Sequence, residues 1–476
     1  MNKIRLLGLI FIAGCATAPE TRRESSSAKA SAARPNIIFI LADDLGYGEL
    51  GSYGQKKILT PRLDKMASEG LRFTNAYSGN AVCAPSRCSL MTGLHQGHAW
   101  VRDNRTYGVE GQTPLPASTV TIARLLQAAG YRTGAMGKWG LGGPGSDGDP
   151  NKQGFDLFYG FNCQGHAHNH YPFYLWKNDQ RVALPGNDGT YKGKQYAHDL
   201  FEKEALDFIQ ANKDRPFFLY VPFTVPHVSL QVPPDSLEPY KDWEEKPYWG
   251  EKGYLPHQRP RAAHAGMITR MDRSVGRILD LVASLGLDEN TLVIFSSDNG
   301  SIDAAGGHDL EFFKGNGALR GEKGQLYEGG IRIPFIARWP GRIKAGTSSD
   351  IPIAFWDVLP TLCDVAKIPT PGRLDGLSFE PTLFGRPQTA HEYFYWEFPS
   401  YGGQQAVRMG RWKAIRTDLA KGPQPVQLYD LETDPAETKD VAAANPSVLA
   451  TIERIMSENH TRSELFPIKG LDGVGR

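Results

Sequence analysis

The sequence predicts an α/β fold: a large, mixed but mostly parallel β-sheet sandwiched by helices, followed by a small C-terminal α+β subdomain with an antiparallel sheet. Three observations support this prediction. Unbroken apolar runs of strand length recur along the chain, and amphipathic helical patterns lie between them. From about Gln388 this alternation is replaced by successive strand-like segments and a closing helix. Strands that are buried on both faces have such unbroken apolar runs, and their alternation with helices is typical of a parallel sheet.

Four apolar runs are expected to form strands of the large sheet. They comprise residues 37–41, 216–221, 292–295 and 333–337. The first run ends at Asp43 and Asp44. The second precedes His227, and the third precedes Asp298 and Asn299. Because ligands of such sheets bind beyond the carboxyl ends of the strands, we expect these polar residues to converge on one crevice.

Two amphipathic helices are predicted between these strands. The first covers residues 118–129, and Gly130 closes it. In the second, apolar residues step by three and four over residues 268–282, and Gly286 follows as a C-cap. An apolar face with this spacing packs against a core, and glycine is the common residue just past a helix end.

The C-terminal part of the chain, residues 388–476, is predicted to form the small subdomain behind a main domain of residues 35–387. Its antiparallel strands are expected at residues 391–398, 406–417 and 427–431, and a closing helix at residues 446–457. No internal repeat is visible in the sequence.

The composition is that of an ordinary soluble globular protein. Of the 476 residues, 40% are hydrophobic and 22% are charged, as is usual for globular chains. The 53 basic and 52 acidic residues leave a formal charge of +1. A nucleic-acid-binding protein normally has a basic excess, so we expect no nucleic-acid partner. Net charge does not exclude a locally positive pocket for an anionic ligand.

The N-terminus has the pattern of an export signal. Lys3 and Arg5 precede a short apolar core over residues 6–13, which is too short to span a bilayer. Ile12-Ala13-Gly14-Cys15 resembles a bacterial lipobox, so residues 1–15 are expected to be a signal peptide with Cys15 lipidated after cleavage. The alternative is ordinary cleavage after residues 16–18 without a lipid. In both alternatives the protein is exported to the periplasm or cell surface. The lipid anchor of the first alternative is the one expected contact with a membrane.

Residues 16–34 contain almost nothing apolar to bury and are expected to be a disordered tether. Apart from Cys15 and Cys83, the chain has Cys88, Cys163 and Cys363. Three cysteines do not make a disulfide framework for a chain of this size.

The most informative local pattern is Cys83-Ala84-Pro85-Ser86-Arg87. Alone, it is compatible with a small buried cysteine at a helix start. Together with the strand ends at residues 43–44 and 298–299, it resembles the sulfatase family, in which the cysteine of C-x-P-S-R is oxidised to formylglycine during export. The resemblance runs from about Pro35 to the chain end. It implies an alkaline phosphatase-like fold, a catalytic domain over residues 35–387 and a formylglycine-generating maturation enzyme as a partner.

An aldehyde suits the hydrolysis of a sulfate ester. A serine nucleophile would leave a stable sulfated enzyme, because attack on that ester is as difficult as the original step. One hydroxyl of a hydrated aldehyde attacks sulfur, and loss of a proton from the other hydroxyl then expels sulfate and regenerates the aldehyde. The resemblance makes Cys83 the site of this formylglycine.

The two acidic strand ends point to a cation site. Asp43, Asp44, Asp298 and Asn299 form an all-oxygen set, which suits Ca²⁺, with Mg²⁺ second, and argues against zinc. The resemblance implies that these residues hold Ca²⁺ together with the modified Cys83. Related two-zinc phosphatases usually have histidine where this chain has Asn299. The alternative is that adjacent acids after a strand serve as a helix cap or turn.

Four further residues match family positions. The resemblance implies that Arg87 pairs with the modified residue and a nearby carboxylate. It implies that Lys138 and Lys323 bind sulfate, and that Lys323 also stabilises charge on the leaving group. His227 resembles the histidine that protonates the leaving oxygen, a role worth roughly 10²–10⁴ in rate. The alternatives are solvated lysines and a capping histidine.

One position departs from the family pattern, which usually reads G-K-W-H-L-G. Gly140 stands where the histidine belongs, and glycine can neither orient the aldehyde hydrate nor donate to sulfate. We hypothesise that His168, in the histidine-rich segment 165–172, fills this vacancy. The alternatives are an ordinary surface loop or a contact to substrate. His308 and Asp309 are candidates for binding substrate hydroxyls at the pocket rim, with an ordinary polar loop as the alternative.

The predicted activity is hydrolysis of sulfate monoesters, and the expected substrate is a carbohydrate such as a terminal galactose or N-acetylgalactosamine. Aromatic residues between 228 and 259 are candidates for stacking on sugar rings, or for covering the core. The enzymatic rival is a formylglycine-dependent phosphomonoester or phosphonate hydrolase. The rival from another class is a non-catalytic lipoprotein that binds sulfated glycans. The sequence leaves open the sugar, the sulfate position, exo or endo action and the oligomeric state.

Overall fold

The computed structural model describes Met1 and residues 34–473, except residues 108, 109, 191, 252, 303 and 304. The predicted signal peptide after Met1, the lipobox Cys15 and residues 16–33 of the predicted tether lie outside the described residues. The chain from Arg34 onward forms one compact unit. The predicted boundary between residues 387 and 388 stays a prediction.

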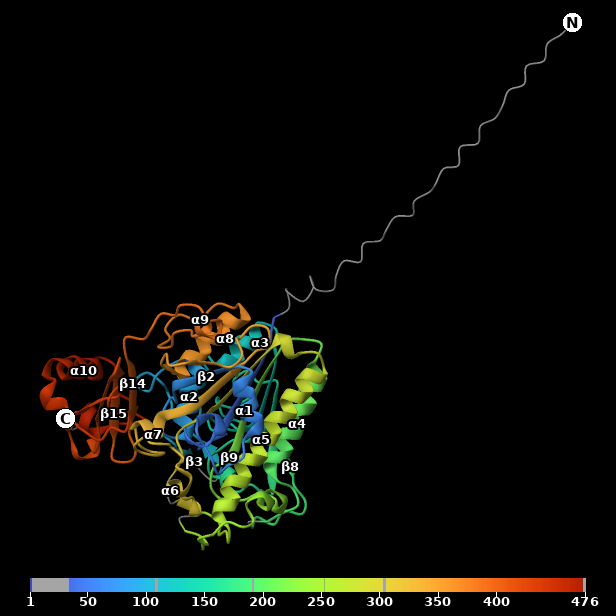
Figure 1. The fold of residues 1–476 in the computed structure, drawn as a ribbon, viewed down its shortest axis with the longest axis horizontal. Helices are drawn as coiled ribbons and strands as arrows, with labels where there is room; N and C mark the ends of the chain where they lie inside the picture. The colour runs from blue at the N-terminus through green and yellow to red at the C-terminus, as the bar shows by residue number, and fades with distance from the viewer. Residues whose placement is uncertain (2–33, 108–109, 191, 252, 303–304, 474–476) are drawn as a thin grey trace. The chain divides into compact units, whose positions relative to one another are not determined.

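A large mixed sheet forms the centre of this unit (Figure 1). Among the described residues its order is β12-β2-β11-β10-β1-β9-β5-β6-β7-β8, and β13 pairs with β2. The central neighbours β10, β1, β9, β5 and β6 are parallel, whereas β11 runs antiparallel to β10. The bounds are β1 (Asn36–Asp43), β2 (Leu71–Tyr77), β5 (Arg132–Lys138), β6 (Leu157–Phe161), β7 (Tyr174–Lys177), β8 (Gln180–Ala183), β9 (Phe217–Pro226), β10 (Thr291–Ser297), β11 (Arg332–Arg338), β12 (Thr347–Ser349) and β13 (Ile353–Ala354).

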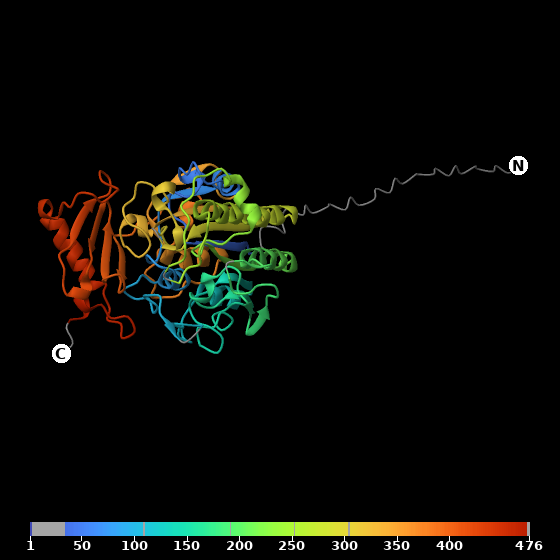
Figure 2. The same cartoon turned by 90° about the horizontal axis from the view of Figure 1, so that it is seen from below.

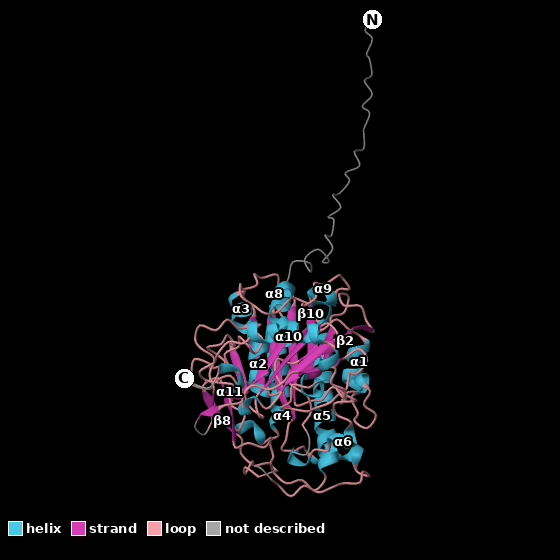
Figure 3. Ribbon diagram, turned by 90° about the vertical axis from the view of Figure 1, so that its left-hand side faces the viewer, coloured by secondary structure: helices cyan, strands magenta, loops and turns pink. Residues whose placement is uncertain are grey.

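Helices cover both faces of the sheet, as predicted (Figures 1 and 3). The side chains of β1 alternate between two apolar clusters, with Ile38 in one and Phe39 in the other, because successive strand residues point to opposite faces. The first cluster includes α1, α4 and α5, and the second includes α2, α3 and α8. The bounds are α1 (Pro61–Ser68), α2 (Cys83–Thr92), α3 (Ile122–Ala128), α4 (Ala197–Asn212), α5 (Pro260–Ser284) and α8 (Val358–Ala366).

Shorter elements lie in the connections. A small hairpin, β3 (Thr106–Tyr107) and β4 (Gly111–Gln112), is separate from the large sheet. Short helices are α6 (Leu310–Phe313), α7 (Glu328–Ile331), α9 (Glu380–Leu383) and α11 (Lys469–Asp472). Within the described part of the chain, no helix has both the length and the apolar character that a membrane span requires.

The second sheet is antiparallel and lies near the C-terminus (Figure 2). Its strands are β14 (Phe394–Phe398), β15 (Gln404–Met409), β16 (Trp412–Arg416) and β17 (Gln427–Asp430), and α10 (Pro446–Glu458) packs on one face. Its other face packs on the main sheet through a cluster that contains Trp396, Trp356 and Tyr77. The predicted α+β subdomain with an antiparallel sheet is therefore confirmed.

Two predicted elements differ in detail. The helix expected from residue 118 begins at Ile122, because Thr121 is its N-cap and its hydroxyl accepts a hydrogen bond from Arg124 N at 3.2 Å. The run 406–417, expected as one strand, is the hairpin of β15 and β16. Gly410 lies in its turn with φ +57°, a left-handed conformation that glycine adopts without steric penalty.

Candidate active site

The acidic strand ends meet at one edge of the sheet. Strands β1 and β10 are parallel and in register up to Ala42 and Ser297, so their next residues emerge side by side. Asp44 N donates to Asp298 Oδ1 at 3.1 Å, and Asn299 Nδ2 donates to Asp44 Oδ1 at 2.8 Å. The expected convergence of residues far apart in the sequence is what the structure shows.

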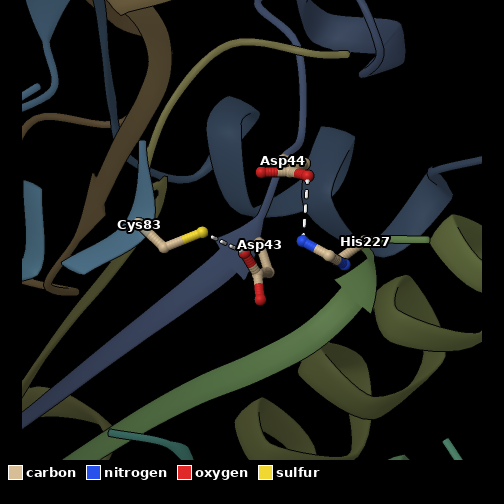
Figure 4. Close-up of side chains that lie close together, drawn as sticks. All are labelled: Asp43, Asp44, Cys83 and His227. Carbon is tan, nitrogen blue, oxygen red and sulfur yellow. Dashed lines mark hydrogen bonds and ion pairs between the residues drawn. The ribbon is translucent and has the colours of Figure 1, made fainter. Parts of the chain in front are cut away.

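Cys83 faces this acidic group from the first residue of helix α2. Its thiol donates to Asp43 Oδ1 at 3.4 Å (Figure 4), and Lys138 Nζ lies 3.3 Å from the sulfur. Burial and the neighbouring Asp43 carboxylate raise the pKa of the Cys83 thiol to about 12. An unmodified Cys83 is therefore a protonated thiol at neutral pH, which makes it a poor nucleophile.

Arg87 lies one helical turn after Cys83 and is completely buried. Its Nη2 donates to Asp298 Oδ2 at 2.8 Å, and its Nη1 donates to the backbone oxygen of Lys138. Arg87 therefore links helix α2 to the ends of β10 and β5. Its contact with Asp43 is longer, at 3.5 Å.

Two buried lysines bring positive charge to the site. Lys138, the last residue of β5, donates to Asp43 Oδ2 at 2.7 Å, and Lys323 donates to Asp44 Oδ2 at 2.7 Å. Burial lowers the pKa of each lysine, but the paired carboxylate and the other acidic groups of the site together outweigh burial and raise it. Both side chains are therefore charged and are placed to bind an anion.

His227 follows β9 and completes the group shown in Figure 4. Its Nε2 lies 3.5 Å from Asp44 Oδ2, and its Nδ1 contacts the backbone oxygen of Val228. Burial and the charge of Lys323 hold the pKa of His227 well below its usual value. The ring is therefore neutral at neutral pH while no anion is bound.

The acidic set fits a hard divalent cation. Ligand atoms of Asp43, Asp44, Cys83 and His227 all lie within 4.8 Å of one another. The Asn299 Oδ1 atom is buried without a hydrogen-bond partner, as expected of an oxygen reserved for a ligand. Burial and the charge of Asp43 raise the pKa of Asp44, and they raise that of Asp298 to about 7. A cation among these oxygens would relieve that repulsion.

The structure places His168 beside His227, and the hypothesis that it compensates for Gly140 stays a prediction. Its ring stacks on that of His227, with centroids 5.1 Å apart, and lies 5.4 Å from Tyr254. A Cβ atom placed on Gly140 would meet Gln164 Nε2 at 2.4 Å and no atom of His168 within 4 Å. His168 thus lies next to His227, and the side chain directly beside Gly140 is that of Gln164. The substrate contact proposed for His168 stays a prediction.

His308 and Asp309 are engaged in contacts of their own. His308 is buried, with its Nε2 3.6 Å from Glu49 and its ring packed on His264. Asp309 accepts from Arg261 Nη2 at 2.6 Å and caps helix α6. Asp309 is thus used within the fold, whereas both ring nitrogens of His308 are buried without a hydrogen-bond partner. The expected contact of the two residues with substrate hydroxyls stays a prediction.

Two further residues at the site were not singled out individually, although His170 belongs to the histidine-rich segment 165–172. His170 Nε2 lies 3.0 Å from the backbone oxygen of His227 and helps to position that segment. Gln164 lies in an irregular connection after β6. An isolated glutamine matches no catalytic pattern, so its place beside Gly140 is visible only in the folded chain.

Comparison with known proteins gives a consistent result. A family model described as Sulfatase matches residues 35–368, and one described as N-sulphoglucosamine sulphohydrolase, C-terminal, matches residues 321–462. Human arylsulfatase A is 34% identical over 88% of this chain and 87% of its own length. An N-acetylgalactosamine-6-O-sulfatase of Bacteroides thetaiotaomicron is 30% identical over 97% of this chain and 100% of its own.

Solved structures agree in fold. The crystal structure of Ps i-CgsB in complex with k-i-k-neocarrahexaose superposes with a TM-score of 0.77 at 29% identity, over 89% of this chain and 92% of that one. A phosphonate monoester hydrolase of Agrobacterium radiobacter superposes with a TM-score of 0.64 at 21% identity, over 91% of this chain and 99% of that one. The second likeness concerns the fold alone.

Proposed function

The chain belongs to the sulfatase family, and from that premise we propose that it hydrolyses sulfate monoesters of carbohydrates through a formylglycine formed from Cys83. The observation that carries the proposal is the position of Cys83, whose sulfur contacts both members of the ion pair between Asp43 and Lys138. The name of the Bacteroides relative and the oligosaccharide bound to Ps i-CgsB support a carbohydrate substrate. We propose a galactose or N-acetylgalactosamine sulfate as the first candidate.

The cation site is part of the proposal. Asp43, Asp44, Asp298 and Asn299, with the modified residue 83, would hold Ca²⁺, or Mg²⁺ as the second choice. The oxygen donors and the unpartnered Asn299 Oδ1 support this choice. When bound, the cation would neutralise negative charge on the nucleophile and on a sulfate oxygen.

The lysines and Arg87 have separate proposed roles in binding the ester and positioning the nucleophile. Lys138 and Lys323 are charged and buried, so they would bind the sulfate oxygens strongly in a region of low dielectric. Arg87 would hold helix α2, and so residue 83, against the acidic strand ends. Because the Arg87 guanidinium and the Asp298 carboxylate have fixed positions, the nucleophile at residue 83 would already be aligned when the ester binds.

His227 is proposed as the general acid for the leaving oxygen. In the free protein its ring is neutral because burial and Lys323 lower its pKa. A bound sulfate ester is an anion that offsets the two lysine charges, so its arrival would raise the pKa of His227 toward the range useful for proton donation. An alkyl leaving group, such as a sugar hydroxyl, depends on that proton.

We also propose that the chain is exported and anchored through a lipid on Cys15, and that a maturation enzyme oxidises Cys83. The support is the lipobox-like pattern and the C-x-P-S-R motif in the sequence. A Cys15→Ala variant expressed in a bacterial host would then leave the membrane fraction. Retention of that variant on the membrane would contradict the lipid anchor.

The activity is tested by comparing turnover of 4-nitrophenyl sulfate and 4-nitrophenyl phosphate, followed by a panel of defined sulfated saccharides. We expect preference for the sulfate ester, with Cys83→Ala inactive. A strong preference for phosphate would favour the phosphomonoester or phosphonate hydrolase. Mass spectrometry of the peptide that contains residue 83 reports the aldehyde, which is lighter than the thiol. An unmodified peptide from the native host would favour a glycan-binding protein without catalysis.

A further inference from the structure

We propose that Gln164 takes the place of the side chain that Gly140 lacks and donates a hydrogen bond to a sulfate oxygen of the bound ester. The proposal rests on the sulfatase function proposed above and adds one sulfate-binding residue to it. Gln164 belongs to no motif, and only the fold brings it to this position.

The geometry beside Gly140 is the first argument. Gly140 has φ +80°, and a Cβ atom built on it would lie 2.4 Å from Gln164 Nε2 and 3.6 Å from Gln164 Cδ. Apart from the adjoining residues 139 and 141, no other heavy atom of the described chain lies within 4 Å of that point. The amide therefore occupies the space that a side chain at position 140 would need.

The second argument is that the Gln164 amide lacks partners. The residue is 5% exposed, and neither Nε2 nor Oε1 has a hydrogen-bond partner among the described residues. Leaving a buried polar group unpaired destabilises a protein by roughly 1–3 kcal/mol, so such groups call for an explanation. A ligand that completes the hydrogen bonds of the amide supplies one.

The third argument is the location of the segment. Strand β6 pairs with β5 so that Phe161 lies opposite Lys138, the lysine beside Cys83. Gly140 N then donates to Asn162 O at 3.1 Å, which holds the two strand extensions together. From Gln164 the chain turns directly into the short helix 166–168, whose last residue stacks on His227. Gln164 therefore belongs to the connection that runs from the strand partner of Lys138 to the residue stacked on His227.

An amide at this position differs from a histidine in its charge and in its pH dependence. Its N–H donates to a sulfate oxygen without carrying charge, and it does not titrate between pH 4 and 10. Gln164 would therefore strengthen binding of the ester and of its transition state without adding a step to the pH profile. A histidine in the same place would add a group that titrates near pH 6.5.

The test begins with Gln164→Ala and Gln164→Glu, assayed on 4-nitrophenyl sulfate with inorganic sulfate as a competitive inhibitor. Loss of one such donor is expected to lower kcat/KM by about 10²-fold, to weaken inhibition by sulfate and to leave the shape of the pH profile unchanged. The carboxylate of Gln164→Glu repels sulfate and is expected to be worse. Asn162→Ala is the matched control, because Asn162 is also a buried amide without a side-chain partner two residues away, but none of its atoms lies within 4 Å of a Cβ atom built on Gly140. It is expected to keep the activity of the wild type.

A reciprocal exchange makes the test specific. Gly140→His alone should be nearly inactive, because its Cβ would overlap the Gln164 amide, whereas Gly140→His combined with Gln164→Ala should recover activity and gain a pH step near 6.5. Histidine tolerates a positive φ better than most residues. Urea unfolding of each variant measures stability separately from activity.

Three outcomes would overturn the proposal: full activity and unchanged sulfate inhibition in Gln164→Ala, equal losses in Asn162→Ala, or a Gln164→Ala variant that loses stability while its sulfate inhibition stays the same. A wild-type protein that hydrolyses no sulfate ester would instead overturn the proposed function, so the two failures are distinguishable.

Discussion

Arg87 donates two hydrogen bonds to a single oxygen of Asp298, from Nε at 3.1 Å and from Nη2 at 2.8 Å. Both side chains are fully buried. Because Arg87 belongs to the helix that begins at Cys83 and Asp298 follows β10, this pair fixes the distance between the residue to be modified and the acidic strand ends.

Replacing Arg87 is expected to destabilise the fold as well as the site. Arg87→Met would leave Asp298 buried beside other carboxylates without its partner, and loss of one partner of a buried ion pair lowers the free energy of unfolding by about 3–5 kcal/mol. Urea unfolding checks this value. The control is Arg454→Met, which breaks an exposed pair with Glu458 and is expected to change stability by under about 1 kcal/mol. Equal effects of the two variants would contradict the prediction.

Asn299→Ala is expected to weaken Ca²⁺ binding. The variant loses the unpartnered Oδ1 atom, and loss of one oxygen ligand is expected to reduce affinity at least roughly tenfold. Calorimetric titration with Ca²⁺ measures this directly, and the rise in melting temperature on adding Ca²⁺ should shrink in parallel. Asn75→Ala, at a side chain bonded only to the backbone oxygen of Asp350, is the control. Unchanged Ca²⁺ affinity in Asn299→Ala would remove this residue from the proposed site.

His227→Ala is expected to show a loss that depends on the leaving group. A sugar hydroxyl needs a proton as it departs, so turnover of a sulfated saccharide should fall about 10²–10⁴-fold. The 4-nitrophenolate group leaves without a proton, so turnover of 4-nitrophenyl sulfate should fall much less. His98→Ala, at an exposed residue paired with Asp375, serves as the control. Equal losses on both substrates would rule out His227 as the general acid.

His198 should contribute to loss of stability in acid. Its Nε2 lies 2.9 Å from Ser274 Oγ, and burial lowers its pKa to about 3. As pH falls below about 6.5, the unfolded chain gains a proton at this site that the folded chain does not. Folding stability from this group is therefore present above pH 6.5 and falls by about 1.4 kcal/mol per pH unit until about pH 3.

The variant His198→Gln removes that contribution while keeping a group that bonds Ser274. Its unfolding free energy, measured with urea at pH 7 and pH 5, should depend less on pH than that of the wild type. If the two proteins lost the same stability between these pH values, the buried neutral state of His198 would be wrong.

Lys413 is expected to be essential for docking of the C-terminal sheet. Its Nζ lies 3.0 Å from Glu328 and 3.6 Å from Glu437, and all three side chains are fully buried. Lys413→Met would remove the cation that two buried carboxylates share, although Glu328 keeps a 3.5 Å contact with Arg332. This loss should lower the free energy of unfolding by about 3–5 kcal/mol. Lys203→Met, which breaks the exposed pair with Asp207, is the matched control. A Lys413→Met variant as stable as its control would show that the network is not needed.

The local patterns of the sequence sufficed for much of the fold and for the acidic group. The runs before Asp43 and Asp298 were recognisable as buried strands, because strands covered on both faces must be apolar throughout. Convergence of their ends then followed from the geometry of parallel neighbours. The hairpin at Gly410 was missed, because a single glycine inside an apolar run does not by itself mark a turn between two strands.

What the sequence determined alone was the chemistry available at each position: the motif at Cys83, the oxygen donors after two strands, and the absence of a side chain at Gly140. Only the tertiary structure decided which of these side chains contact one another. The Gln164 amide lies beside Gly140 and His168 stacks on His227, and Asp309 accepts a hydrogen bond from Arg261. The reason is physical. A contact between side chains on two separate loops depends on the backbone conformations of both loops, and the sequence pattern of one loop does not specify that contact.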